Sequence, residues 1–173
     1  IDSLGNRYIG RSTTVVCLSP TGALLWQRTF SNLTVQDLYV NPQGEVFVAA
    51  GAESSSTPRC YFPYLFKLDS SGAVVWSWSR STGCSYRWSI LGETTSGLLC
   101  ASPGNIAYFF NPDGTLAYTT SSGNPGSSYW GFGAGDSVLL RDGSTAHMVR
   151  FVNSPANQYA DSLGFNAPTG SFI

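Results

Sequence analysis

The stretch that decides the fold is YLFKLDSSGAVVW, from Tyr64 to Trp76. It consists of an apolar run, the turn sequence DSSG and a second apolar run that ends in tryptophan. Short runs rich in Val, Tyr, Phe, Leu and Trp, bounded by Gly, Asn, Asp and Ser, are typical of β-strands. Asp at the first and Gly at the fourth turn position suit a type I turn. The stretch therefore predicts a β-hairpin.

Related stretches recur along the chain, in units that begin near residues 7, 45, 97 and 137. SPTGALLW at 19–26 and NPDGTLAY at 111–118 repeat both the turn and the aromatic residue after it. No window of about 11 residues keeps apolar residues at a helical spacing without an intruding Gly or Pro. Units of about 40 to 45 residues with four short strands each predict the blades of a β-propeller.

We therefore expect an all-β fold in which residues 1–173 form a single β-propeller domain of four four-stranded antiparallel blades. The sequence DSLG at 2–5 recurs at 161–164. This recurrence predicts that the strand near 157–164 completes the first blade, so that the two ends of the chain share it. The alternative is that the four units form an arc of a larger ring. We expect Trp26, Trp76 and Tyr118 to pack between blades.

The charge of the chain and the length of its apolar runs argue against two classes of partner. Only 11% of its 173 residues are charged, and the formal net charge is -1, which offers no attraction for phosphate backbones. No apolar run approaches the roughly 18 residues of a membrane span. We expect no nucleic acid and no membrane insertion. A surface rich in Gly, Ser and Thr favours an extracellular, cell-surface or virion location.

The units resemble the bacterial β-propeller repeats of the SBBP type, in which a DxxGNxYxxG segment is followed by a KLDxxGxxxW segment. DSLGNRYIG at 2–10 matches the DxxGNxY part of the first segment, with its last Gly one residue early, and KLDSSGAVVW at 67–76 matches the second segment. The resemblance implies a propeller, often secreted or at a surface, and brings no catalytic residues. The hairpin pattern also resembles the blades of quinoprotein dehydrogenases, which implies a quinone and calcium enzyme as the alternative. The chain lacks the vicinal cysteine pair and acidic cluster that would support it.

Strand alternation places the loops between second and third strands on the same face as the loops that join blades. These loops span residues 10–12, 31–34, 52–61, 81–87, 102–105, 121–128 and 141–145. Cys60 and Cys84 both fall on this face of one blade, and we predict a disulfide between them. Arginines and aromatic residues, which are enriched at binding interfaces, surround the pair. The predicted contact residues are Arg59, Tyr61, Tyr86, Arg87, Trp88, Tyr129 and Trp130.

The alternative for Trp88 and Tyr129 is that they begin inner strands and pack inward. His147 is the single histidine, and GFGAG at 131–135 lacks the strand–helix setting of a dinucleotide loop. We therefore expect no catalytic residues, no metal and no cofactor. The function expected is non-enzymatic recognition or assembly, with protein or glycan bound through the loops. A quinoprotein-like enzyme and a purely structural self-assembling subunit are the alternatives.

Overall fold

The computed structural model describes the chain except for residues 56–59, 82–87, 95, 103–105, 122–136, 140–144, 154–157 and 167–173. The side chains of Ile106 and of all residues from 120 onward are also outside the described part. Regular structure in the described residues is β-strand arranged in four antiparallel sheets, which confirms the all-β prediction. Within the same residues, no helix is long and apolar enough to cross a membrane.

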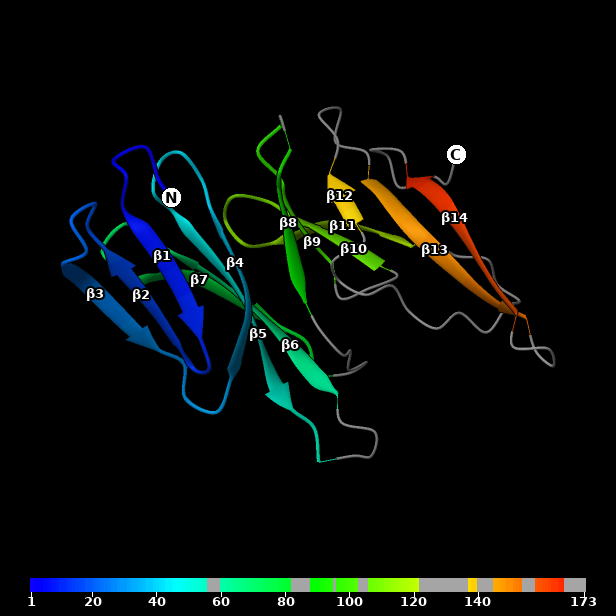
Figure 1. Ribbon diagram of the computed structural model, residues 1–173, viewed down its shortest axis with the longest axis horizontal. Helices are drawn as coiled ribbons and strands as arrows, with labels where there is room; N and C mark the ends of the chain where they lie inside the picture. The colour runs from blue at the N-terminus through cyan, green and yellow to red at the C-terminus, as the bar shows by residue number, and fades with distance from the viewer. Residues whose placement is uncertain are drawn as a thin grey trace. The chain divides into compact units, whose positions relative to one another are not determined.

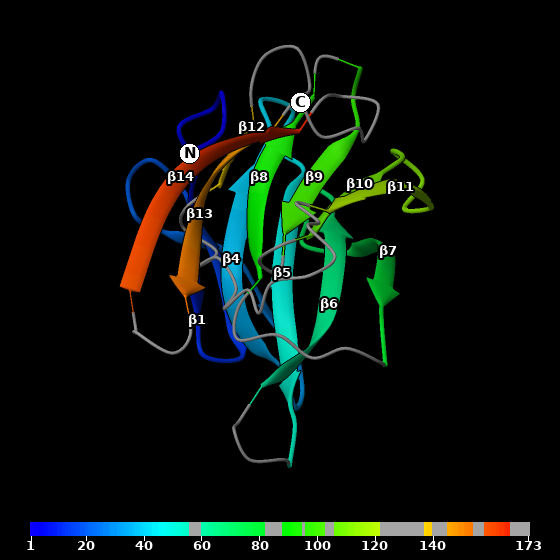
Figure 2. The ribbon, with the colours of Figure 1, turned by 90° about the vertical axis from the view of Figure 1, so that its right-hand side faces the viewer.

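The chain divides into two compact units, residues 1–90 and 91–173. The first unit contains two sheets, which stand side by side in Figure 1. The first sheet has the order β1-β2-β3 and consists of β1 (Arg7–Arg11), β2 (Thr14–Leu18) and β3 (Leu24–Thr29). The second has the order β4-β5-β6-β7, seen in Figure 2, and consists of β4 (Thr34–Val40), β5 (Val46–Glu53), β6 (Tyr61–Leu68) and β7 (Val74–Ser79).

The division between the units falls within β8 (Ser89–Glu93), and two further sheets follow. The third sheet joins β8 to β9 (Leu99–Ser102), β10 (Ile106–Phe110) and β11 (Leu116–Ser121), in the order β11-β10-β9-β8. The fourth sheet has the order β12-β13-β14 and consists of β12 (Ser137–Leu139), β13 (Thr145–Asn153) and β14 (Gln158–Asn166). Among the described strands, two sheets thus have the four expected of a blade and two have three.

The prediction that the strand near 157–164 completes the first sheet is wrong about its pairing. β14 is hydrogen-bonded to β13 over nine residue pairs, from Asn153 opposite Gln158 to Thr145 opposite Asn166. The carboxylate of Asp2 holds its turn by accepting bonds from the backbone and side chain of Asn6 and from the Tyr8 hydroxyl. After the second DSLG, at 161–164, the corresponding residues are Phe and Ala. The second copy lacks these two side-chain donors and lies inside β14.

One turn structure occurs six times in the described residues, and Asp69–Gly72 shows its chemistry. The Gly72 amide donates to the Asp69 carbonyl at 3.0 Å, and the Ala73 amide donates to the Asp69 carboxylate at 3.0 Å. Gly72 has φ +81°, a conformation that glycine adopts without strain. The predicted turns at 19–22, 69–72 and 111–114 are confirmed. The six turns begin at Asp2, Ser19, Asn41, Asp69, Thr94 and Asn111.

Trp26 joins the two sheets of the first unit, as expected of an inter-blade aromatic. Its indole N–H donates to the Ser70 carbonyl at 2.9 Å, and its ring lies over Gly72, whose added Cβ would come within 2.7 Å of it. The core between the two sheets contains Val15 and Phe30 from the first side and Val46, Val48 and Leu68 from the second. The burial of these apolar side chains is the main contribution that stabilises the interface between the two sheets.

The other two predicted packing aromatics have partners within their own sheets. Trp76 lies 6.2 Å from the Phe47 ring, and Tyr118 stacks on Phe109 with centroids 4.5 Å apart. Phe109, Cys100 and Ala107 form the buried cluster of the third sheet. The recurring aromatic position therefore contributes to the core of each sheet in which it is described.

Candidate functional site

The loops of the first unit gather at one end, as strand alternation predicts. The β1–β2 turn, the β3–β4 connection and the adjoining ends of β5 and β6 lie along its lower side in Figure 1. Two backbone bonds tie the first two together: the Val35 amide donates to the Ser12 carbonyl and the Phe30 amide to the Thr13 carbonyl, both at 2.7 Å. We call residues 10–13, 30–34 and 52–61, as far as they are described, the loop end.

A β-bulge in β4 shapes a pocket beside the loop end. Val35 pairs with Ala50 and Asp37 with Ala49, so Gln36 is an extra residue without a partner position in the β4–β5 ladder. Bulges re-aim side chains and are frequent next to functional sites. The pocket has a volume of about 230 Å³ and is lined by Gly10, Val35, Gln36, Asp37 and Leu38.

The side-chain oxygens of Gln36 and Asp37 in this pocket already accept hydrogen bonds from backbone N–H groups. The side-chain carbonyl of Gln36 accepts from the Trp88 amide at 2.7 Å. The two carboxylate oxygens of Asp37 accept from the Leu38 and Ile90 amides, each at 2.9 Å. These bonds fix the start of β8 against the bulge. The arrangement positions the backbone of Trp88 and Ile90.

Two of the predicted contact residues are described, and they differ in outcome. The Trp88 side chain is only 1% exposed and packs 5.8 Å from the Trp78 ring, so the prediction that it contacts a ligand is wrong and its inward-packing alternative holds. Tyr61 is half-buried at the start of β6. A Cβ added to Gly51 would lie 2.6 Å from the Tyr61 Cβ and 2.9 Å from the Gln36 amide nitrogen. Tyr61 therefore packs beside the bulge.

The remaining predicted contact residues lie outside the described part of the chain. They are Arg59, Tyr86, Arg87, Tyr129 and Trp130. Cys84 is outside it as well, so its disulfide with Cys60 stays a prediction. Cys17 and Cys100 are buried free thiols, as their position in apolar strands predicts, and burial raises the pKa of Cys100 to about 12.

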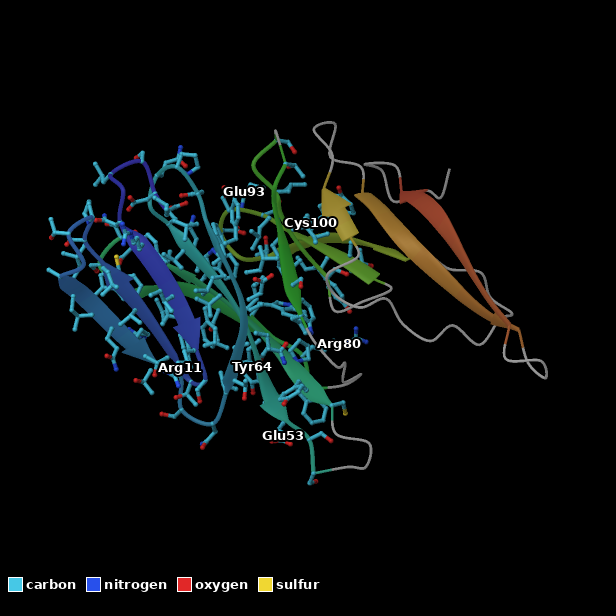
Figure 3. The ribbon with its side chains drawn as sticks, viewed as in Figure 1. Arg11, Glu53, Tyr64, Arg80, Glu93 and Cys100 are labelled. Carbon is cyan, nitrogen blue, oxygen red and sulfur yellow. The ribbon has the colours of Figure 1, made fainter. Side chains whose placement is uncertain are left out.

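Four residues within the predicted loop ranges were not among the predicted contact residues. Ser12 and Asn32 are exposed and have positive φ angles of 52° and 62°, which non-glycine residues seldom adopt. Arg11 and Glu53 add exposed charges of opposite sign, and Figure 3 places both on the lower side of the unit. The polar pair Gln36-Asp37 inside an apolar strand was the available signal for the bulge. Among the described residues, no group of three His, Cys, Asp or Glu side chains could hold a metal ion.

Comparison with known proteins gives information on the fold and none on the function. No family model matches the chain, and no curated protein does. Among solved structures, the chain is similar to a protein of unknown function from Bacteroides caccae, with a TM-score of 0.53 and 15% sequence identity over 91% of this chain. The chain spans 56% of the length of that protein. A likeness at this identity concerns the fold alone.

Proposed function

We propose that the chain is a non-enzymatic β-propeller, or an arc of one, that binds a protein or glycan outside the cytoplasm through the loop end. Sheets of three or four antiparallel strands follow one another along the chain, and one turn structure recurs in three of the four. In the first unit, consecutive sheets pack face to face around Trp26. These features support the propeller, whose sheets pack in this way.

The observation that carries the binding role is the contrast between a rigid frame and an exposed polar end. The turn, connection and loop at this end are held by short backbone bonds, while Arg11, Ser12, Asn32 and Glu53 are exposed. Binding residues concentrate in loops that a rigid scaffold positions. The pocket beside them would fit a ligand by its shape rather than by hydrogen bonds. The side-chain oxygens of Gln36 and Asp37 in it already accept hydrogen bonds from backbone amides.

The proposal includes the disulfide between Cys60 and Cys84. Cys17 and Cys100 are free thiols, whereas Cys60 is not among the free cysteines of the described residues. Such a bond would hold the β5–β6 loop to the segment before β8 and suits an oxidising location. Peptide mapping of the unreduced protein, with exchange blocked by acid, should give a Cys60–Cys84 linked peptide. Free thiols at both positions would contradict this part of the proposal.

A binding experiment tests the loop end with two matched variants. Arg11 and Arg7 are exposed on the same face of β1, at its two ends. Nanomolar labelled protein is applied to an array of immobilised glycans and extracellular protein domains. We expect at least one ligand whose signal falls about tenfold or more with Arg11→Glu, the size of one lost charged contact, while Arg7→Glu keeps it.

Two outcomes contradict the proposal. Equal losses with Arg11→Glu and Arg7→Glu would remove the binding site from the loop end, and silence on the whole array would remove the binding role for these ligand classes. Dye reduction that requires both pyrroloquinoline quinone and calcium would instead support the quinoprotein-like enzyme. The array is read at a protein concentration low enough to prevent association between copies of the protein, so the signal reports ligand binding alone.

A further inference from the structure

The β3–β4 connection carries a sequence motif with a chemistry of its own. It reads Asn32-Leu33-Thr34. Asn-x-Thr, with x other than proline, is the acceptor sequence for N-linked glycans, which are attached to surface segments of secreted proteins. No other asparagine among the 173 residues is followed two positions later by serine or threonine. The motif therefore marks one position of the chain.

Asn32 lies in a β-turn with its side chain exposed. The Leu33 amide donates to the Phe30 carbonyl at 3.3 Å and closes the turn. Asn32 has φ +62°, in the left-handed region where asparagine is several-fold enriched among residues other than glycine. Within the described part of the chain, no hydrogen bond engages the side-chain amide of Asn32. Its nitrogen is therefore open to modification.

The other two residues of the motif divide between the core and the surface. Leu33 packs against the core between the first two sheets, beside residues such as Val15 and Phe30. Thr34 is exposed at the first position of β4. Leu33 thus anchors the motif, while Asn32 and Thr34 on either side of it lie at the surface. A glycan on Asn32 would leave the core contact of Leu33 in place.

We infer that Asn32 is the acceptor of an N-linked glycan when the chain enters a secretory compartment. The donor is an oligosaccharide carried on a lipid diphosphate. The amide nitrogen of Asn32 forms a bond to the anomeric carbon of the first sugar, and the bond from that carbon to the diphosphate breaks. The lipid diphosphate leaves with the electron pair, and a base of the transferase takes the amide proton. The Thr34 hydroxyl completes the motif that the transferase recognises.

The inference rests on the location in the proposed function, outside the cytoplasm, and not on ligand binding. Transfer acts on the extended chain as it enters the compartment, so it requires the motif alone. In the folded chain, the glycan would stand on the loop end. Val35 directly follows the motif, and its amide donates to the Ser12 carbonyl at 2.7 Å. The glycan would therefore cover the part of the loop end around Ser12.

Expression of the full chain in insect cells, behind a cleavable secretory signal, tests the inference by intact mass. We expect the wild type, in lysate and medium, to carry the mass of one oligosaccharide. A peptide N-glycosidase should remove this mass and leave aspartate at position 32. Asn32→Asp, which tolerates the left-handed turn, should lose the whole glycan. Thr34→Val should lose it as well, because it removes the hydroxyl and keeps the β-branched shape of a strand residue.

Two further variants should keep the glycan. Thr34→Ser retains a hydroxyl at the required position, and Thr29→Val makes the valine substitution at an exposed strand residue outside the motif. A wild type from which the signal has been cleaved but which carries no glycan would overturn the inference. A glycan that persists in Asn32→Asp or in Thr34→Val, or that is lost with Thr29→Val, would also overturn it. The binding array uses bacterially expressed protein without this glycan, so failure of the binding role is a separate result.

Discussion

The contact between Trp26 and Gly72 can be weighed against a built-in control at Gly22. Each glycine occupies the fourth position of its own turn, and the two turns have the same structure, with φ +81° at Gly72 and +88° at Gly22. Only Gly72 has the indole over it. Replacing each glycine by alanine should cost roughly 1–2 kcal/mol for the left-handed backbone conformation. That conformational cost is shared, so any difference between the two variants measures the inter-sheet contact.

The additional cost at Gly72 follows from the distances. A Cβ there would lie 2.7 Å from two carbon atoms of the indole ring, closer than such atoms approach, so the ring must move. Its movement strains the 2.9 Å bond from Trp26 to the Ser70 carbonyl, which contributes about 0.5–1.5 kcal/mol. With lost packing, we expect Gly72→Ala to be destabilising by about 2–4 kcal/mol and Gly22→Ala by about 1–2 kcal/mol.

Urea denaturation at low micromolar protein, followed by circular dichroism, measures both free energies of unfolding. A double-mutant cycle with Trp26→Ala assigns the difference to the indole. In that background Gly72→Ala should cost no more than Gly22→Ala. Equal destabilisation in the wild-type background, or an excess at Gly72 that persists without the indole, would refute the reasoning.

Three further predictions use single side chains. Ser12→Gly should stabilise the protein by roughly 1 kcal/mol in thermal or urea unfolding, because it relieves a left-handed φ of 52° on an exposed turn; a loss of stability would show that the side chain has a stabilising contact. The Cys100 thiol, whose pKa burial raises to about 12, should resist iodoacetamide at pH 8 until the protein is unfolded. Burial opposes the ionisation of Glu45, but hydrogen bonds from Lys67 and Asn41 outweigh it and lower its pKa. Glu45→Gln should therefore be less stable than the wild type at neutral pH, with the difference shrinking as pH falls below the ordinary value of 4.5; a pH-independent difference between the two proteins would contradict this.

Local chemistry made part of the fold predictable. The sequence KLDSSG predicts its turn, because the two features that form it, the Asp69 carboxylate and the left-handed Gly72, lie within the turn itself. The register of Trp26 after the equivalent turn predicted a packing role that the Ser70 contact confirms. The features that depend on residues close together in the sequence could therefore be predicted.

Strand pairing and exposure were harder, because both depend on residues distant in sequence. The second DSLG matches the first in letters, yet it lies within the long-range pairing of β13 with β14 and not in a turn. Trp88 has a loop-like sequence before it, yet its side chain is buried, and its backbone amide donates to Gln36, which is far from it in the chain. The bulge itself has no local turn residue to announce it. The candidate site was thus predictable as a loop face, but its individual contacts were not.

The recurring turns also bear on how the chain acquires its structure. Each of the hairpins at Ser19, Asp69 and Asn111 closes strands that are neighbours in sequence. Such contacts have low contact order, and isolated hairpins form in about 1–10 µs. Trp26, by contrast, meets Ser70 across 44 residues. In a variant that keeps Trp26 and has phenylalanine at the other four tryptophan positions, refolding followed by indole fluorescence should therefore report a later event than refolding followed by circular dichroism, with the hairpins assembled before the sheets dock.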